Sequence, residues 1–174
     1  NKNNKKWWLR HFEVDIDEKI TNFLNTQISE GNEEVPSKYL NLKKCKISFA
    51  SLIIENKIGE LNDAKLFNYL PLSINLNLPF LINADFIPDG EREGLINNEW
   101  NQFLLETSGF EFVQFIKVTL NNEKINDEFK FSIFNLIPSF NINAEKLKNN
   151  EKWFNYFNSF KFGFENALIG EKPI

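Results

Sequence analysis

The segment LPFLINADFIPDGEREGL, residues 78–95, decides the fold and raises the question of function. Apolar residues occupy every second position from Phe80 to Phe86, which is the pattern of a strand with one buried face. The strand runs into the charged loop DGERE, residues 89–93, which holds Arg92, one of only two arginines in the chain. We therefore expect a core strand that ends in a polar loop with a role beyond folding.

Strand-like alternation recurs through the first half of the chain. A hairpin turn is expected at residues 55–57, and Pro71 is expected to break the last of these strands. The further predicted strands are residues 7–15, 46–54 and 66–70.

Segments in which apolar residues recur at helical spacing lie between and after these strands. We expect a long helix that begins after Asn97 or Asn98 and bends near Gly109. Residues 129–134 fit either a strand or the continuation of a helix. The other predicted helices begin at Asp15 or Asp17 and run to about Ile28, begin at Pro36, and lie within residues 144–168.

Together these elements predict an α+β fold in which a mixed or antiparallel sheet packs with helices. Residues 1–120 are expected to form the α+β domain, and residues 121–174 a mostly helical C-terminal extension of that same domain. A chain of 174 residues is long enough to bury a substantial core.

Composition excludes several functions. A net charge of −4 and a pI near 5.2 argue against non-specific nucleic-acid binding. One cysteine, Cys45, and one histidine, His11, cannot form a disulfide or a zinc cluster. With no apolar run of membrane-spanning length and no leader segment, we expect a cytoplasmic protein without a membrane partner. The lack of methionine and the polar, lysine-rich start suggest a piece of a longer protein.

Acidic residues near the quoted loop have two interpretations. Asp85, Asp89, Glu91 and Glu93 could include a catalytic acid and base, because two carboxyl groups in different environments can divide proton donation from acceptance. The plainer interpretation is that charged residues gather in an exposed loop, and the residues alone favour it.

A second motif suggests a metal-dependent enzyme. Glu128 and Lys130 have the Glu-x-Lys spacing used by a class of magnesium-dependent nucleases, in which Asp85 or Asp89 would supply a further ligand. The chain is rich in Lys and Glu, so the same tripeptide is expected by chance.

Arg92 stands at a strand-to-helix junction between two glycines. It could form an exposed ion pair with Glu91 or Glu93, which would contribute little to stability. The aromatic residues between Trp153 and Phe164 could form a surface for another protein, although their helical spacing favours core packing.

Four blocks occur in an order that resembles a known family: ISFA (47–50), LFNYLPL (66–72), LPFLINADFIPDGERE (78–93) and EWNQFLL (99–105). They look like the segment that follows the ATP-binding module in sacsin-type proteins and their bacterial relatives. That module is of the GHKL type and is similar to that of the ninety-kilodalton heat-shock chaperone. WWLRHFEVDID (7–17) and FKFGFENAL (160–168) fit the same family less specifically.

The resemblance implies a middle or transducer domain with a ribosomal-protein-S5-domain-2-like fold. Such a domain has no complete active site and no cofactor of its own, whereas the parent protein would use ATP and magnesium. Its partner would be the upstream ATP-binding domain of the same chain, with protein clients as further partners in chaperone-like remodelling or bacterial defence. Arg92 matches the position from which relatives contact the γ-phosphate, and Glu93 matches the orienting residue beside it.

Overall fold

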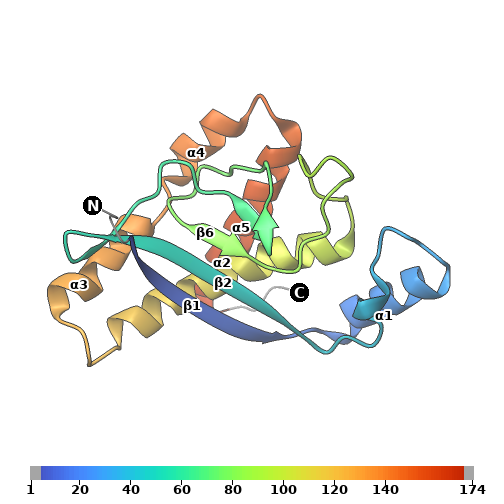
Figure 1. Cartoon of the computed structure of the whole chain (residues 1–174), viewed down its shortest axis with the longest axis horizontal. Helices are drawn as coiled ribbons and strands as arrows, with labels where there is room; N and C mark the ends of the chain where they lie inside the picture. Colours follow the sequence, from blue (N-terminus) through green and yellow to red (C-terminus); the bar gives the residue numbers. More distant parts are fainter. Residues whose placement is uncertain (1–4, 171–174) are drawn as a thin grey trace.

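The computed structural model describes residues 5–170, which form a mixed sheet packed against helices (Figure 1). Within these residues the sheet has six strands in the order β1-β2-β6-β4-β5, and β3 pairs with β2 outside this path. The pairings are antiparallel except that β4 runs parallel to β6. The strands are β1 (Lys6–Asp15), β2 (Lys44–Ile54), β3 (Lys57–Gly59), β4 (Leu66–Asn68), β5 (Leu70–Pro71) and β6 (Leu81–Asn83).

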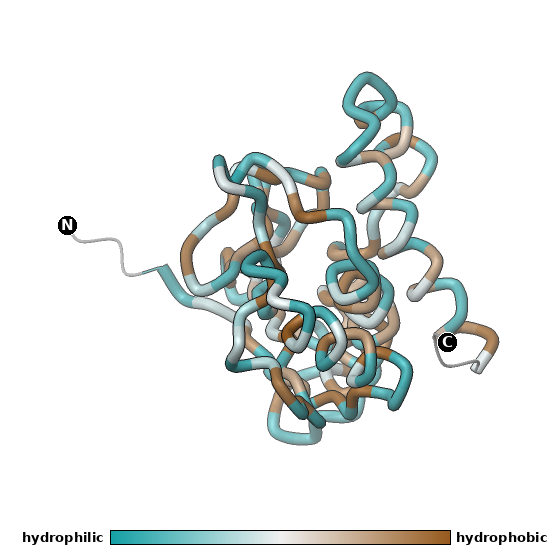
Figure 2. The backbone as a smooth tube through the Cα atoms, turned by 90° about the vertical axis from the view of Figure 1, so that its right-hand side faces the viewer, coloured by the Kyte–Doolittle hydropathy of each residue, from teal (hydrophilic) through white to brown (hydrophobic). Residues whose placement is uncertain are grey.

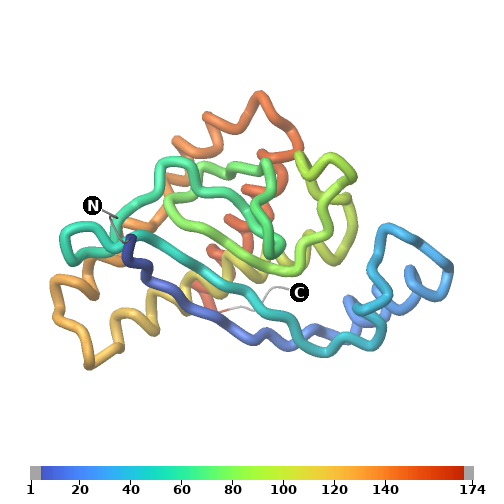
Figure 3. The backbone as a smooth tube through the Cα atoms, viewed as in Figure 1, coloured from blue at the N-terminus to red at the C-terminus, as the bar shows by residue number. Residues whose placement is uncertain are grey.

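The helices α2 and α5 lie behind the sheet in Figure 1, whereas α1, which joins β1 to β2 in the chain, stands at one end of the molecule. The tube in Figure 3 shows the last helix, in red, beside the long helix α2, in yellow. The helices are α1 (Glu18–Ser29), α2 (Glu99–Leu120), α3 (Asp127–Phe131), α4 (Phe140–Leu147) and α5 (Glu151–Ile169), with 3-10 turns η1 (Ser37–Tyr39) and η2 (Ser132–Leu136).

Aromatic rings join the two layers. The rings of Phe80 and Phe112 stack with centroids 4.3 Å apart, and those of Phe49 and Phe115 stack at 5.6 Å. Each of these side chains is buried, and burying one such ring contributes about 1.5–3 kcal/mol. Figure 2 shows apolar and polar stretches interspersed along the chain, as expected for elements with one buried face.

Two glycines allow α2 and α5 to touch through their backbones. A Cβ atom added at Gly109 would overlap the carbonyl oxygen of Phe160, and one added at Gly163 would overlap the carbonyl oxygen of Glu106. Only glycine fits at both points, because any side chain would push the helices apart. This contact fixes where α5 lies along α2.

The structure confirms the α+β class, the mixed sheet and the helical C-terminal part. Asp17 and Asn98 cap α1 and α2, because each side chain accepts a hydrogen bond from a backbone N–H of the first turn. Phe80, Ile82 and Phe86 are buried, as the alternation in the quoted segment predicts. Residues 121–170 contain helical elements and no described strand.

The structure decides between the two interpretations of residues 129–134 and corrects the expectation for Pro71. Residues 129–134 are not a strand: they belong to α3 and η2, and Ser132 Oγ accepts a hydrogen bond from Ile58 N at 2.8 Å. Pro71 does not simply end a strand, since β4 stops at Asn68 and Pro71 pairs with Phe67 from β5. Gly109 lies within α2, which runs without interruption from Glu99 to Leu120, and its place there serves the contact with α5.

We predict that Gly109→Ala lowers the free energy of unfolding by at least about 3 kcal/mol, because the added methyl group meets backbone atoms of α5 that cannot rotate away. Helix propensity alone would change stability by about 1 kcal/mol in the opposite direction. Urea unfolding measures the difference. Gly90→Ala is the matched control, because nothing lies within 4 Å of the added atom; equal effects of the two changes would contradict the packing account.

Candidate functional site

The loop of residues 88–95 is a folded structure. Pro88 and Leu95 form an antiparallel bridge across its base. Within it, Asp89 N donates to Gly94 O at 3.0 Å and Arg92 N donates to Asp89 O at 3.0 Å. The Asp89 side chain also accepts from the N–H of Glu93 at 3.1 Å. These bonds give the loop one defined shape.

Asn101 of α2 holds both ends of the loop. Its amide nitrogen donates to Ile87 O and to Ile96 O, each at 2.8 Å, and its amide oxygen accepts from Ile87 N at 2.8 Å. The side chain is buried, so these partners replace water completely. The start of α2 therefore fixes the chain before and after the loop.

Helix α5 holds the far side of the same loop. The hydroxyl of Tyr156 accepts from Leu95 N at 2.9 Å and donates to Leu95 O at 3.1 Å. The indole of Trp153 donates to Glu93 O at 3.3 Å. Because α2 and α5 touch at the two glycines, their hold on the loop depends on one helix pair.

The Arg92 side chain lies at the surface of this platform. Its guanidinium donates to Leu70 O at 3.3 Å, and its own carbonyl accepts from Ser73 N at 2.9 Å. Within residues 5–170 Arg92 forms no ion pair, so the predicted pairing with Glu91 or Glu93 is wrong. Most of the guanidinium donors remain available to a partner.

Two of the six non-glycine residues with positive φ among those described, Arg92 and Tyr69, lie at this site. Arg92 has φ 59° and Tyr69 has φ 57°, a region that L-residues other than Asn and Asp seldom adopt. Arg92 and Tyr69 are brought together because the Arg92 side chain binds Leu70, the residue after Tyr69. Such conformations cost about 1–3 kcal/mol each and cluster at functional sites.

Two hollows border the loop. One of about 720 Å³ lies between α2 and α5 and is lined by Asn97, Gln102, Asn155 and Phe162 among others. The other, of about 420 Å³, is lined by residues that include Asp89, Glu93 and Lys152. The loop is therefore a ridge between two concave areas, which suits a surface that receives a partner.

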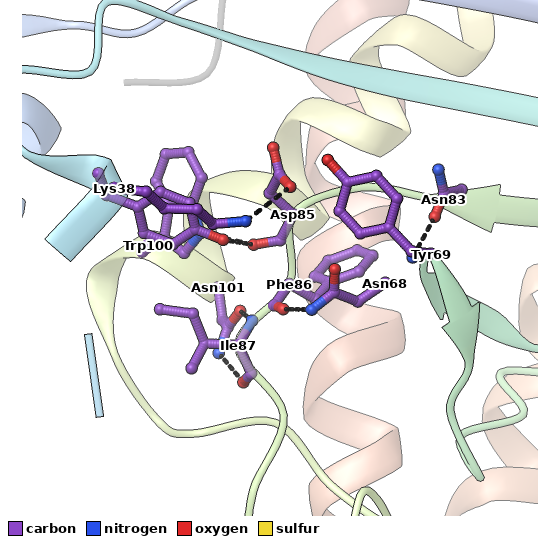
Figure 4. A network of polar contacts seen from close by, with 10 residues as sticks. Lys38, Asn68, Tyr69, Asn83, Asp85, Phe86, Ile87, Trp100 and Asn101 are labelled. Carbon is purple, nitrogen blue, oxygen red and sulfur yellow. Dashed lines mark hydrogen bonds and ion pairs between the residues drawn. The ribbon is translucent and has the colours of Figure 1, made fainter. Parts of the chain in front are cut away.

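Asp85 belongs to a separate polar cluster at the end of the same strand (Figure 4). Its carboxylate lies 3.8 Å from Lys38 Nζ, and its carbonyl accepts from Trp100 Nε1 at 2.9 Å and from the Tyr39 hydroxyl at 3.1 Å. The Lys38 ammonium also lies over the rings of Tyr39 and Tyr69, at 5.0 and 5.7 Å from their centroids.

This cluster changes the acidity of its neighbours. The Asp85 carboxylate raises the pKa of Tyr69 through its negative charge. Burial, with a smaller contribution from Asp85, raises the pKa of Tyr39. Burial likewise raises the pKa of Cys45 to about 12. These groups stay protonated near neutral pH, so the cluster does not supply an activated thiolate or phenolate.

The structure keeps the suggested nuclease residues apart. Glu128 pairs with Lys57 at 2.8 Å and Lys130 with Asp127 at 3.2 Å, near the Ile54 end of β2. Asp85 lies just beyond Asn83, which pairs with Ser48 of β2. Ser48 and Ile54 are six residues apart along β2, so about 20 Å or more separates Asp85 from Glu128 and Lys130. Among residues 5–170 no three His, Cys, Asp or Glu side chains gather as metal ligands would.

The remaining candidates are structural. His11 is exposed on β1 and its Nδ1 lies 2.7 Å from Ser48 Oγ. Cys45 is buried at the start of β2, as predicted. Of the C-terminal aromatic residues, Phe157 and Phe160 are fully buried, while Phe162 is half exposed. The core interpretation of this aromatic segment is therefore the better one.

Sequence reasoning missed the residues that hold the loop. Asn101 and Tyr156 gave no signal, because the chain is rich in Asn and because Tyr156 lies 61 residues from its partner Leu95. Lys38 was also missed. The only indication in the sequence was the position of Asn101, a polar residue in the first turn of the helix predicted to follow the loop.

Comparison of the chain with protein-family models, with curated proteins and with solved structures gave no significant match. In the part of the chain that the structure describes, no helix combines the length and the apolar character needed to cross a membrane.

We predict that Asn101→Ala lowers the free energy of unfolding by about 3 kcal/mol, since it leaves Ile87 N and Ile96 O without their hydrogen-bond partner and removes one of the two bonds to Ile87 O, which keeps only the bond from Ile96 N. Urea unfolding measures the loss. Gln102→Ala, which removes an exposed bond to Glu106, serves as the control and should change stability by less than about 0.5 kcal/mol. A small effect of Asn101→Ala would mean that the loop does not need this clamp.

We predict that iodoacetamide modifies Cys45 at least about a hundredfold more slowly in the folded chain than in urea at pH 9. The thiolate is the reactive form, and burial holds the pKa of the folded thiol at about 12, so little thiolate is present. Mass spectrometry follows the modification with time. Equal rates in the two states would show that the Cys45 end of β2 is open to solvent.

Proposed function

We propose that this chain is a non-catalytic coupling domain that docks on an adjacent GHKL-type ATP-binding module in a sacsin-like protein. The loop of residues 88–95 is the docking surface, and Arg92 contacts the terminal phosphate of ATP held by that module. The observation that carries the proposal is a surface guanidinium, without an ion-pair partner among residues 5–170, on a loop held by two helices.

Coupling requires a rigid presentation of Arg92. A guanidinium that approaches phosphate from a fixed position can form paired hydrogen bonds, and it loses them when the terminal phosphate leaves. The bonds from Asn101 and Tyr156 to the loop backbone support this requirement. Docking of the domain would then depend on the nucleotide state of its neighbour.

The acidic neighbours of Arg92 fit a contact of this kind. The Asp89 carboxylate is engaged within the loop, whereas Glu91 and Glu93, which flank Arg92 in the sequence, are exposed. Their charges oppose the capture of free anions, so phosphate binds only when a second module places it before Arg92. We therefore expect the isolated chain to bind ATP weakly, with Glu93 in the orienting position that the family resemblance implies.

We predict that Arg92→Ala, made in the longer polypeptide that carries the ATP-binding module, lowers kcat for ATP hydrolysis at least about tenfold with little change in KM. Arg92→Lys should restore only part of the activity, because an ammonium cannot form the paired contacts of guanidinium. A steady-state phosphate-release assay measures both variants.

Lys161→Ala, on the exposed side of α5, is the control for a loss of surface charge. The melting temperature of each variant separates a folding defect from a catalytic one. Unchanged turnover in a folded Arg92→Ala protein would refute the phosphate contact.

A further inference from the structure

The free edge of β1 forms a second surface, separate from the loop of residues 88–95. β1 is ten residues long and stands at one end of the strand order, paired only with β2 in the described part of the chain. An edge strand presents a row of unpaired N–H and C=O groups that can receive another strand.

The face of β1 that points toward the helices is incompletely covered. Trp8, Phe12 and Val14 are only partly buried, although Trp8 donates to Thr119 Oγ1 at 3.1 Å and meets the ring of Phe129. A groove of about 420 Å³ opens between the end of β1 and the middle of α2, with Val14, Phe103 and Phe110 among its lining residues. An added strand could place apolar side chains in this groove.

Arg10, in the middle of this face, has one nitrogen without a hydrogen-bond acceptor. Its guanidinium lies 5.2 Å from the Trp8 ring, and its Nε is buried without a hydrogen-bond acceptor in the part of the chain that the structure describes. A buried donor without an acceptor costs about 1–3 kcal/mol, which an acidic side chain on an adjacent strand would remove. Arg10 thus specifies the charge of one position in an incoming strand.

The Asp15 end of β1 is acidic. Glu13, Asp15, Asp17 and Glu111 border the groove. Of these, Glu13 and Asp15 also lie near Lys44 on β2, and Asp17 caps α1. This acidic rim favours basic side chains at the corresponding end of an added strand.

A second copy of the chain does not satisfy this pattern. When two copies pair antiparallel through this edge, residues that lie opposite each other point to the same face of the sheet. One central residue of β1 therefore lies opposite the same residue of the second copy. The two registers that use nearly the whole strand place Arg10 against Arg10 or His11 against His11. The first register sets like charges directly opposite each other, which is destabilising. The second places Arg10 opposite Phe12, which offers no acceptor to the guanidinium. The edge therefore suits a different partner.

We propose that the β1 edge binds an extended segment of a partner protein by antiparallel strand addition. The segment carries basic residues opposite Glu13 and Asp15, apolar residues opposite Val14, Phe12 and Trp8, and an acidic residue opposite Arg10. Backbone hydrogen bonds supply affinity, and the charge order supplies specificity.

A synthetic ten-residue peptide, KVKVTEVVTE with blocked ends, is built to this pattern from the Asp15 end to the Lys6 end. We expect it to bind the chain in a fluorescence anisotropy titration, and we expect the charge-reversed peptide EVEVTKVVTK to bind at least about tenfold more weakly. Hydrogen exchange with the first peptide bound should protect alternate amides along β1, because only every second amide faces the free edge.

Reversing the charge at Arg10 tests the proposed contact between Arg10 and the central glutamate of the peptide. Arg10→Glu should weaken KVKVTEVVTE about tenfold and improve KVKVTKVVTE, in which lysine replaces the central glutamate. This gain of binding cannot come from a folding defect. The proposal is overturned if no binding occurs at about 100 μM peptide, if protection lacks the alternate pattern, or if light scattering shows that β1 is already covered by a second copy.

Discussion

The backbone contact between α2 and α5 at Gly109 and Gly163 is the constraint on which the rest of the structure depends. It sets how far α5 lies from the sheet, so that Phe160 joins the aromatic core. It also brings Tyr156 to the loop that Asn101 holds from α2. A shift of one helix along the other would release the loop from one side, because each bond is only about 3 Å long.

The two surfaces of the chain obey different physical rules. The loop of residues 88–95 has its backbone groups satisfied internally and offers one charged side chain, so it suits a contact of defined geometry. The β1 edge offers backbone groups and a charge order, so it suits an extended segment. The first surface is proposed to sense a nucleotide through Arg92, whereas the second is proposed to select a partner through Arg10.

The sequence predicted the elements whose pattern is local. Alternation identified β2 and the buried face around Phe80. The polar pairs Asp15 or Asp17 and Asn97 or Asn98 predicted the beginnings of α1 and α2, and Asp17 and Asn98 are the residues that cap them. Residues 129–134 could not be decided from the sequence, because their alternating aromatic residues also fit a helix that ends in a 3-10 turn. There, packing of Ser132 against β3 outweighs the strand pattern.

The candidate site was only partly predictable. The sequence marked Arg92 and its junction, but not the bonds from Asn101, Tyr156 and Leu70 that hold it, since these join elements distant along the chain. The edge position of β1 requires knowledge of the strand order, which no local pattern contains. Backbone order parameters from ¹⁵N relaxation of residues 89–95 test the central claim most directly: helix-like values near about 0.85 are expected for a preformed platform, and values below about 0.6 would contradict it.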